Sequence, residues 1–241
     1  MQGAPPLIEA VGLAKHFGGI FAVDHLDFAV FEGELVGLIG PNGSGKTTTI
    51  NLLSGNLGID AGLVRVRGQV VNGLPASGFA GVGIGRTFQI TQLFGRMSVL
   101  ENMLVPGLAR PHAVKRAVVR EARQHLEFLG LASLESLAAK NLSGGQQKLL
   151  ELGRALMLRP AILFLDEPFA GVNPYLRDQI IGFVKVLHEA GRTFVIVDHD
   201  LDAIQRLVRR LVVMSRGKKI ADGSLATVRE NRDVIKAYSG T

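Results

Sequence analysis

The 241-residue chain contains neither cysteine nor tryptophan. Without cysteine it can form no disulfide bond and no cysteine-ligated metal site, and this fits a reducing compartment. No apolar stretch approaches the roughly 20 residues that a membrane-spanning helix needs. Residues 1–6 do not combine a charged region with a following apolar one, so we expect no signal peptide there. A role in a membrane process would therefore be carried out from outside the lipid.

Hydrophobic residues and glycine are abundant. Hydrophobic residues make up 47% of the chain, which suffices for a sizeable core, and the length favours one large domain or one domain with a subdomain. The 30 glycines indicate tight turns or backbone that approaches a ligand closely. The formal net charge of +6 fits an Arg-rich solvated surface or attraction to nucleotide, nucleic acid or an anionic membrane face. Because the positive residues form no long block, a nucleic-acid-binding arm is not indicated.

Short, continuous apolar runs predict buried β-strands. Continuous runs are typical of parallel strands that are covered on both faces. Helical stretches separate them, so the sequence predicts an α/β fold with a mainly parallel sheet. The predicted strands are Leu35–Ile39, Ile162–Leu165, Phe194–Val197 and Leu211–Met214.

Two other parts of the chain have a different pattern. Short segments near the N-terminus are rich in β-branched residues and bounded by glycine, which predicts an antiparallel sheet beside the main one. From about Ser98 to Arg159 the pattern is mostly helical, and residues 114–131 form an amphipathic stretch. A helical subdomain inserted between two core strands is the simplest interpretation. The predicted antiparallel strands are Leu7–Val11, Phe28–Phe31, Leu63–Val66 and Val70–Val71.

The segment GPNGSGKT follows the first predicted core strand and precedes a predicted helix. It matches the phosphate-binding pattern G-x-x-x-x-G-K-[ST] in the strand–loop–helix context that this pattern requires. Glycines let several N–H groups point at one centre, and the helix N-terminus adds partial positive charge. Lys46 would reach the β- and γ-phosphates, and the Thr47 hydroxyl would bind Mg²⁺. The predicted nucleotide-binding residues are Gly40, Pro41, Asn42, Gly43, Ser44, Gly45, Lys46, Thr47 and Thr48.

A second apolar strand ends in two carboxylates, Asp166 and Glu167. Ligands bind at the carboxyl ends of strands in doubly wound sheets, so this pair is expected beside the phosphate-binding loop. Asp166 would hold Mg²⁺, and Glu167 would orient and deprotonate the attacking water, a role worth about 10²–10⁴-fold in rate. The alternative is an acidic pair that faces solvent; the phosphate-binding loop favours the catalytic interpretation.

Two further polar residues are candidates for the same site. His199 follows the predicted strand 194–197, and we expect it to contact the γ-phosphate and the attacking water, although a lone histidine at a strand end is usually structural. Gln89 lies at the start of the helical region, where it could touch Mg²⁺ or water and report the nucleotide state. Without the other motifs Gln89 would be interpreted as a surface residue.

The segment LSGGQ at 142–146 predicts a second anion-binding helix N-terminus. Ser143 is a suitable N-cap, and residues 147–158 continue as a helix with apolar side chains at helical spacing. This segment lies about 100 residues after the phosphate-binding loop. Two phosphate-binding ends on one chain suggest two chains that face each other across a nucleotide.

Together these motifs resemble those of the ABC ATPase family, in the family's order and over nearly the whole chain. The resemblance implies an α/β P-loop NTPase core with an antiparallel β-subdomain and a helical subdomain, and it implies ATP and Mg²⁺ as cofactors. The matching elements are the Walker A loop at 40–47, Gln89, the signature at 142–146, the Walker B strand at 162–166, the catalytic Glu167 and the switch His199.

The family resemblance has two further implications for this chain, the first of which is that two such domains pair head to tail. Each ATP would lie between one P-loop and the signature residues of the other subunit, namely Ser143, Gly144, Gly145 and Gln146. Phe17 occupies the family's aromatic position for stacking on adenine; tyrosine is commoner there, but phenylalanine keeps the π-face. The alternative for Phe17 is a core residue.

Three segments resemble one branch of the family, the LivG-like ATPases of branched-chain amino acid importers. They are residues 85–102, 170–174 and 233–240. Asn173 replaces the aspartate of the general family, which weakens any argument for carboxylate-mediated cross-talk between two sites. Asp198 stands where that branch usually has glutamate. Importers of urea, amides or other amino acids and lipopolysaccharide export ATPases share much of this pattern.

The resemblance implies one ABC ATPase domain over residues 1–241, with a helical subdomain at about 98–159. It also implies a cytoplasmic protein, peripheral on the inner face of the membrane, with permease subunits docked near residues 89–102. A second ATPase, identical or related, would be a direct partner, and a substrate-binding protein an indirect one. The rivals are a soluble ABC ATPase that acts on nucleic acid or ribosomes and a P-loop switch or kinase. We expect no nucleic-acid partner, and the signature argues against the switch or kinase.

Overall fold

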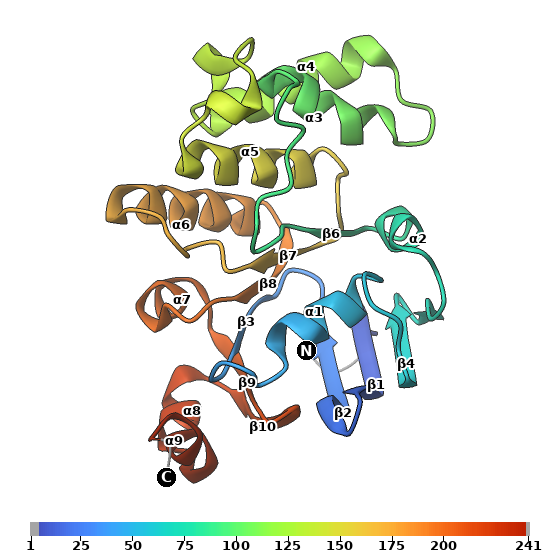
Figure 1. The fold of residues 1–241 in the computed structure, drawn as a ribbon, viewed down its shortest axis with the longest axis vertical. Coiled ribbons are helices and arrows are strands. Elements are labelled where there is room, and N and C mark those ends of the chain that lie inside the picture. Colours follow the sequence, from blue (N-terminus) through green and yellow to red (C-terminus); the bar gives the residue numbers. More distant parts are fainter. Residues whose placement is uncertain (1–4, 240–241) are drawn as a thin grey trace.

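A six-stranded, mainly parallel sheet forms the centre of the computed structural model, which describes residues 5–239 (Figure 1). Five neighbouring strands are parallel, and β10 pairs antiparallel with β9 at one edge. The four predicted core strands are confirmed to within one residue at each end. In sheet order the strands are β10 (Lys218–Gly223), β9 (Arg210–Ser215), β3 (Leu35–Ile39), β8 (Thr193–Val197), β7 (Ile162–Asp166) and β6 (Ile84–Arg86).

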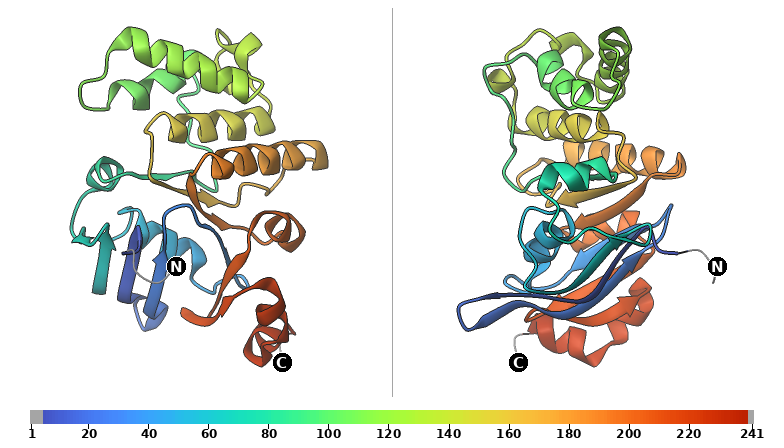
Figure 2. Two further views of the ribbon diagram at one scale, coloured as in Figure 1. Left: turned by 180° about the vertical axis from the view of Figure 1, so that it is seen from behind. Right: turned by 90° about the vertical axis from the view of Figure 1, so that its right-hand side faces the viewer.

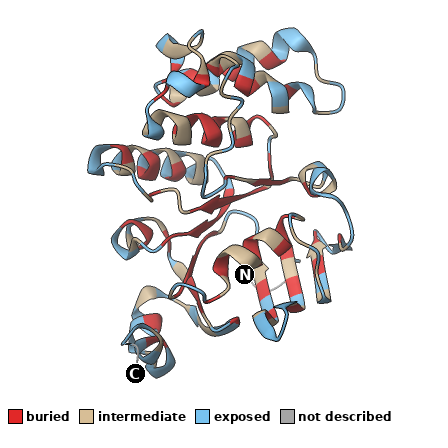
Figure 3. Ribbon diagram, in the orientation of Figure 1, coloured by how far each residue is buried: buried red, intermediate tan, exposed pale blue. Residues whose placement is uncertain are grey.

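Both faces of this sheet are covered, which is why its strands are continuously apolar. All five residues of β7 and of β8 are buried (Figure 3). Side chains alternate along β7: Leu163 and Leu165 belong to one hydrophobic cluster, and Phe164 belongs to another on the opposite face. The first cluster includes the helices between β6 and β7, and the second includes the N-terminal sheet.

The N-terminal sheet is antiparallel, as predicted, with the order β2-β1-β4-β5. Its first two strands form a hairpin that projects from the molecule and is longer than predicted (Figure 2). Register shifts along β1 interrupt the side-chain alternation, so only the ends of the hairpin were recognisable as strands. The strands are β1 (Ile8–Phe17), β2 (Ile20–Val30), β4 (Ala61–Val66) and β5 (Gln69–Val70).

The helices divide between the two faces. Helix α1 (Lys46–Leu53) shares a core with the antiparallel sheet, and the short α2 (Ala76–Gly81) precedes β6. Helices α3 (Val99–Leu108), α4 (Lys115–Phe128) and α5 (Gly144–Leu156) form a separate layer on the far side of β6 and β7 (Figure 1). This arrangement confirms the predicted α/β core with an antiparallel β-subdomain and an inserted helical subdomain.

Several short elements complete the fold. Two 3₁₀ turns, Ala132–Leu134 and Ala139–Asn141, link α4 to α5. Helices α6 (Pro174–Glu189) and α7 (Leu201–Leu207) connect the core strands, and α8 (Leu225–Glu230) and α9 (Arg232–Ser239) follow β10. Within residues 5–239, none of the helices combines the length and the hydropathy needed to cross a bilayer.

Candidate functional site

Four parallel strands end at one edge of the main sheet, and a candidate motif follows each of them. The P-loop follows β3, His199 follows β8, and Gln89 follows β6; Asp166 ends β7 and Glu167 comes directly after it. Because β3, β8, β7 and β6 are consecutive parallel neighbours, their carboxyl ends meet at the same edge. The structure therefore brings together the residues that the sequence placed more than a hundred positions apart.

Two P-loop glycines, Gly40 and Gly45, are required both by their backbone conformation and by the space around them. Gly40 and Gly45 have φ angles of 150° and 102°, which side chains rarely adopt. A Cβ atom on Gly40 would collide with the Met214 carbonyl oxygen, and one on Gly45 would collide with that of Ala22. The backbone can follow this tight path only without side chains, and the loop then opens directly into α1.

Lys46 lies inside the cradle that this loop forms. Its ammonium donates to the carbonyl oxygens of Gly40 (2.8 Å) and Pro41 (3.0 Å), and the residue is buried. Burial lowers the pKa of Lys46, while the nearby carboxylates of Glu167 and Asp166 oppose this shift. The arrangement holds a cation beside the amides of a helix N-terminus, which favours an anionic ligand.

Asp166 is buried beside the cradle with one oxygen bonded and one free. Its Oδ2 accepts from Arg86 Nη2 (3.3 Å), and its backbone N–H donates to Thr87 Oγ1 (3.3 Å). Among residues 5–239, no hydrogen-bond partner reaches Asp166 Oδ1. Burial raises the pKa of Asp166, and the charge of Arg86 opposes that rise. A buried, unpaired carboxylate oxygen is a ready ligand for a cation.

Arg86 was not singled out by the sequence. Its guanidinium is buried and donates to Asn51 Oδ1 (2.6 Å) and Ser54 Oγ (3.0 Å) as well as to Asp166. Its charged end also lies over the Phe88 ring, 4.4 Å from the centroid. Arg86 thus joins β6, the end of α1 and the Asp166 carboxylate. Nothing in the local pattern of the sequence pointed to these partners.

Glu167 and Gln89 meet across the site. Gln89 Nε2 donates to Glu167 Oε2 (3.0 Å). Glu167 has a φ angle of 48°, a left-handed conformation that is uncommon for residues other than glycine. Its backbone N–H donates to the Val197 carbonyl (2.7 Å), and its carbonyl accepts from Lys148 Nζ (3.0 Å). The structure therefore brings two predicted catalytic residues into direct contact.

His199 follows β8, with its side chain 63% exposed. Its Nδ1 lies 3.7 Å from Asp198 Oδ1. Asp198 itself is buried and accepts from the backbone N–H groups of Phe169 and Asp200, both at 2.9 Å. Asp198 thus fixes the turn after Glu167 to the end of β8, a role that sequence reasoning missed.

The signature segment begins α5 as predicted. Ser143 Oγ accepts from the Gln146 N–H (3.3 Å), and the Gln146 side chain accepts from the Ser143 N–H (2.9 Å), which is a capping box. A Cβ atom on Gly145 would collide with Leu176, whereas a Cβ on Gly144 would meet no atom of residues 5–239 within 4 Å. Helix α5 packs on the opposite face of the main sheet from α1. The signature and the P-loop of one chain therefore occupy different faces.

The structure also places Phe17, for which the sequence left two interpretations, and Asn173. Phe17 ends β1, opposite Ile20, and is 53% exposed, so the interpretation of Phe17 as a core residue is wrong. The Lys15 ammonium lies 5.7 Å from its ring centroid. Asn173 is the N-cap of α6: its Oδ1 accepts from the Leu176 N–H (2.9 Å), and Pro174 takes the first helical position.

The metal-ligating side chains present fit Mg²⁺ better than a transition metal. In the described part of the chain, no three His, Asp or Glu side chains gather as a metal-binding group. The predicted ligands Thr47, Gln89 and Asp166 offer only oxygen donors, which Mg²⁺ prefers, together with the oxygens of a phosphate. The free Oδ1 of Asp166 meets the requirement for one carboxylate ligand.

A phosphate-binding loop that opens a helix, with carboxylates on a nearby parallel strand, defines a P-loop nucleotide-binding protein of the α/β class. The sequence profile of the ABC transporter family matches residues 23–170, so the chain belongs to this family. It is accordingly an ABC-type ATPase.

Known relatives and solved structures are similar to this chain over almost its whole length. The chain is 38% identical to the high-affinity branched-chain amino acid transport ATP-binding protein BraF of Pseudomonas aeruginosa, covering 98% of each protein. It is 36% identical to LivG of Escherichia coli, a protein with the same description, again covering 98% of each. The ADP conformation of an ATP-binding cassette of an ABC transporter has a TM-score of 0.87 and 35% identity, covering 99% of this chain and 100% of that one. A dimeric bacterial ABC transporter cassette has a TM-score of 0.83 and 27% identity, covering 90% and 98%.

Proposed function

We propose that this chain is the ATPase subunit that powers the import of branched-chain amino acids through a membrane permease. The observation that carries the ATPase chemistry is the convergence of the P-loop, Asp166, Glu167 and Gln89 at one sheet edge. The solute class rests on the near full-length similarity to BraF and LivG. Import of other amino acids fits the same similarity.

Each site residue has a proposed role. The P-loop N–H groups and Lys46 bind the phosphates, and the exposed ring of Phe17 stacks on adenine. Glu167 deprotonates the attacking water. Gln89 orients Glu167, to which its side-chain amide is already hydrogen-bonded. His199 contacts the γ-phosphate from the adjacent strand end. Thr47, Gln89 and Asp166 would hold Mg²⁺, and the chemistry it would supply there is neutralisation of charge on the phosphates.

The proposed partner in hydrolysis is a second ATPase subunit, identical or related. Ser143, Gly144 and Gly145 would contact the nucleotide on the partner's P-loop. The separation of the signature and the P-loop on different faces of one chain supports contact in trans. Gly144 also supports contact in trans. A Cβ atom there would meet no described residue, and the φ angle is not positive, so neither crowding nor backbone conformation requires a glycine at this position. The similarity to a dimeric cassette is consistent with this pairing.

The proposed permease contact is the loop and helix at residues 89–102. Three large apolar side chains are exposed there or immediately before it: Phe88 (37%), Ile90 (76%) and Phe94 (46%). Such a cluster is costly to leave in water and suits a protein partner.

We place the subunit at the cytoplasmic face of the membrane, bound through the permease, with a substrate-binding protein acting only indirectly. The proposed domain spans residues 1–241, with 98–159 as its helical subdomain.

Other transporters of the same architecture remain candidate functions. The segments that favour the amino-acid branch also occur in ATPases of urea or amide import and of lipopolysaccharide export. A soluble ABC ATPase that acts on nucleic acid or ribosomes is a weaker candidate, because the chain has no long basic block. A nucleic-acid-stimulated ATPase rate would favour that last reading.

The first experiment is a pull-down of tagged Glu167→Gln protein with ATP from gently solubilised native membranes. Replacing the base with an amide should stop hydrolysis and trap an ATP-bound dimer. Hydrophobic permease subunits identified by mass spectrometry would support the transport function, and a second ATPase would establish a heterodimer. Recovery of soluble proteins or ribosomes alone would contradict it. A Glu167→Gln protein that hydrolyses ATP at the normal rate would contradict the assignment of the base.

A further inference from the structure

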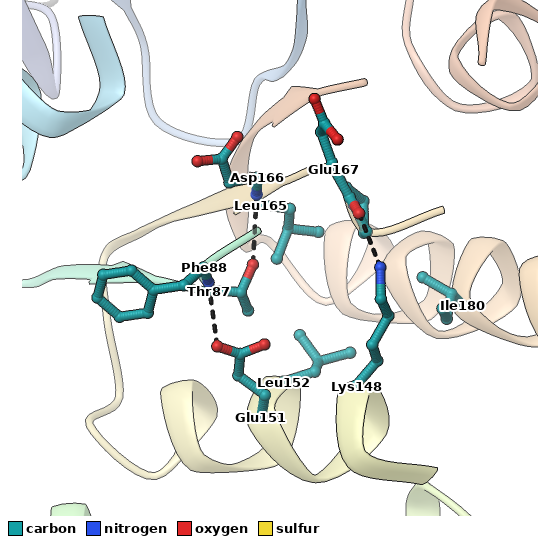
Figure 4. Close-up of a pocket in the computed structure, with 10 residues that line it drawn as sticks. Thr87, Phe88, Lys148, Glu151, Leu152, Leu165, Asp166, Glu167 and Ile180 are labelled. Atoms are coloured by element: carbon teal, nitrogen blue, oxygen red, sulfur yellow. Dashed lines mark hydrogen bonds between the residues drawn. The ribbon is translucent and has the colours of Figure 1, made fainter. Parts of the chain in front are cut away.

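Two charged side chains on one face of α5 point toward the loops that carry Glu167 and Phe88 (Figure 4). Lys148 and Glu151 lie three residues apart, so they project from the same face of the helix. The Lys148 ammonium donates to the Glu167 carbonyl oxygen (3.0 Å), and Glu151 Oε1 accepts from the Phe88 N–H (3.0 Å). The helix that begins with the signature is therefore bonded to the two loops that carry Glu167 and Gln89.

The first part of the loop at residues 87–98 is hydrogen-bonded to α5, whereas its second part bonds Asn102 of α3 and residues 139–140. The loop contains neither helix nor strand, so its backbone groups lack the partners that such elements supply. Glu151 is only 6% exposed and also accepts from the Gln92 N–H (3.5 Å). Arg154, one turn further along, donates to the Gln92 carbonyl, and its guanidinium lies 4.9 Å from the Phe94 ring centroid.

Burial of these charges is costly unless hydrogen bonds offset it. Burial raises the pKa of Glu151 and lowers that of Lys148, which reflects the cost of ionising each group there. Apolar side chains of similar size would fill the same space without that cost. Unlike apolar side chains, Lys148 and Glu151 each form a hydrogen bond to the backbone of a loop, at Glu167 and at Phe88 respectively.

Glu167 has a backbone conformation that needs such support. A left-handed φ angle of 48° is strained for a residue with a side chain, and strained residues persist where their surroundings hold them. The Val197 carbonyl holds the N–H of Glu167, and the Lys148 ammonium holds its carbonyl. With both ends of the residue fixed, its carboxylate meets the side-chain amide of Gln89.

We propose that Lys148 and Glu151 are positioning residues that fix Glu167 and the Gln89 loop to the signature helix. Lys148 acts through the Glu167 carbonyl, and Glu151 acts through the Phe88 N–H. A shift of α5 on contact with the partner's nucleotide then moves the base and Gln89 together. The inference rests on the proposed function, in which Glu167 is the base and α5 carries the signature.

Lys148→Met tests the first contact, because methionine keeps the length of the side chain and loses the donor. We expect kcat for ATP hydrolysis to fall at least tenfold, while the Kd of a fluorescent ATP analogue changes less than threefold. Lys148→Arg, which restores a cationic donor, should recover most of the rate. Lys185→Met, an exposed lysine on α6, is the matched control and should leave both values unchanged.

Glu151 is tested by hydrogen exchange followed by mass spectrometry. Glu151→Ala should speed amide exchange at residues 87–92 at least tenfold, with exchange in α6 unchanged. Glu151→Gln keeps an acceptor oxygen and should retain most of the protection. Glu189→Gln, at an exposed position at the end of α6, is the control.

Two results would overturn the inference: a kcat of Lys148→Met within twofold of the wild type, or unchanged exchange at 87–92 in Glu151→Ala. If Lys148→Met does not fold, Lys148→Leu, which also lacks a donor, takes its place in the same comparison. The wild-type rate separates this failure from that of the proposed function. A wild-type protein that hydrolyses no ATP contradicts the function, whereas a hydrolysing protein that is insensitive to Lys148 substitution contradicts only the positioning role.

Discussion

Asn173 stands where the general ABC pattern has aspartate, and the structure gives this residue a local role. Its side-chain oxygen caps α6 through the Leu176 N–H, just before Pro174. An amide oxygen does this as well as a carboxylate does, so the replacement preserves the start of the helix. This requirement is independent of any communication between two nucleotide sites.

Replacing Asn173 with alanine should therefore reduce stability. The variant leaves one N–H of the first turn of α6 unbonded, and we expect the free energy of unfolding in urea to fall by about 0.5–2 kcal/mol. Asn173→Asp keeps an acceptor and adds a negative charge at a helix N-terminus, so it should match or exceed wild-type stability. Equal losses in the two variants would show that capping is not the cause.

Residues that act through their neighbours were the ones that the sequence could not reveal. Lys46, Asp166 and Glu167 stand in local patterns that define their chemistry. Arg86 bonds partners 32, 35 and 80 positions away, and those partners are known only once β6 and β7 are paired. Asp198 likewise works through the Phe169 N–H, which no spacing rule identifies.

At the scale of elements, burial decided which strands were predictable. Strands β3, β7, β8 and β9 are covered on both faces and read as unbroken apolar runs. The edge strand β10 has no buried residue, and β6 has only three residues, so neither stood out. The hairpin of β1 and β2 was recognised only at its ends because its tip is exposed and its register is irregular.

The helical layer is fastened by a carboxylate shared between two arginines. Glu121 on α4 accepts from Arg110, just after α3, at 2.6 and 2.9 Å and from Arg159, just after α5, at 2.8 and 3.1 Å. These bonds, those from Arg110 first, lower the pKa of Glu121 from its ordinary value of 4.5 to about 2. The ionised form is therefore favoured by folding.

Glu121→Gln should lower the free energy of unfolding by about 1–2 kcal/mol at neutral pH, with allowance for solvent screening. Because the pKa is depressed in the folded state, the contribution is present above pH 4.5 and is lost as the pH falls toward 2. Urea unfolding at several pH values should therefore show the two proteins converging in acid. Glu127→Gln, at an exposed position of the same helix, should match the wild type throughout. A difference that is constant with pH would contradict the ion-pair explanation.

For the whole molecule, the question is whether one chain can complete its own nucleotide site. The P-loop side contains the proposed phosphate ligands, the proposed base and the proposed Mg²⁺ ligands, all at the carboxyl edge of the sheet. The signature helix starts in the other layer, where Gly144 is exposed and a Cβ would have room. Because the fold of this chain does not require glycine at position 144, we infer that the absence of a side chain there serves contact with the partner's nucleotide.

Gly144→Ala tests this reasoning on the assembly. Alanine is the better helix former, so the Tm of the isolated chain should stay the same or rise slightly. The new methyl group would lie between the signature and the partner's phosphate, and we expect ATP-dependent dimerisation to weaken and turnover to fall at least tenfold. Gly182→Ala makes the same change at an open, exposed position in α6 and should leave turnover intact.

Gel filtration with ATP in the Glu167→Gln background measures the dimer directly. Normal dimerisation and turnover in Gly144→Ala would mean that this helix N-terminus does not approach a nucleotide, and the pairing of two ATPase subunits would need another geometry.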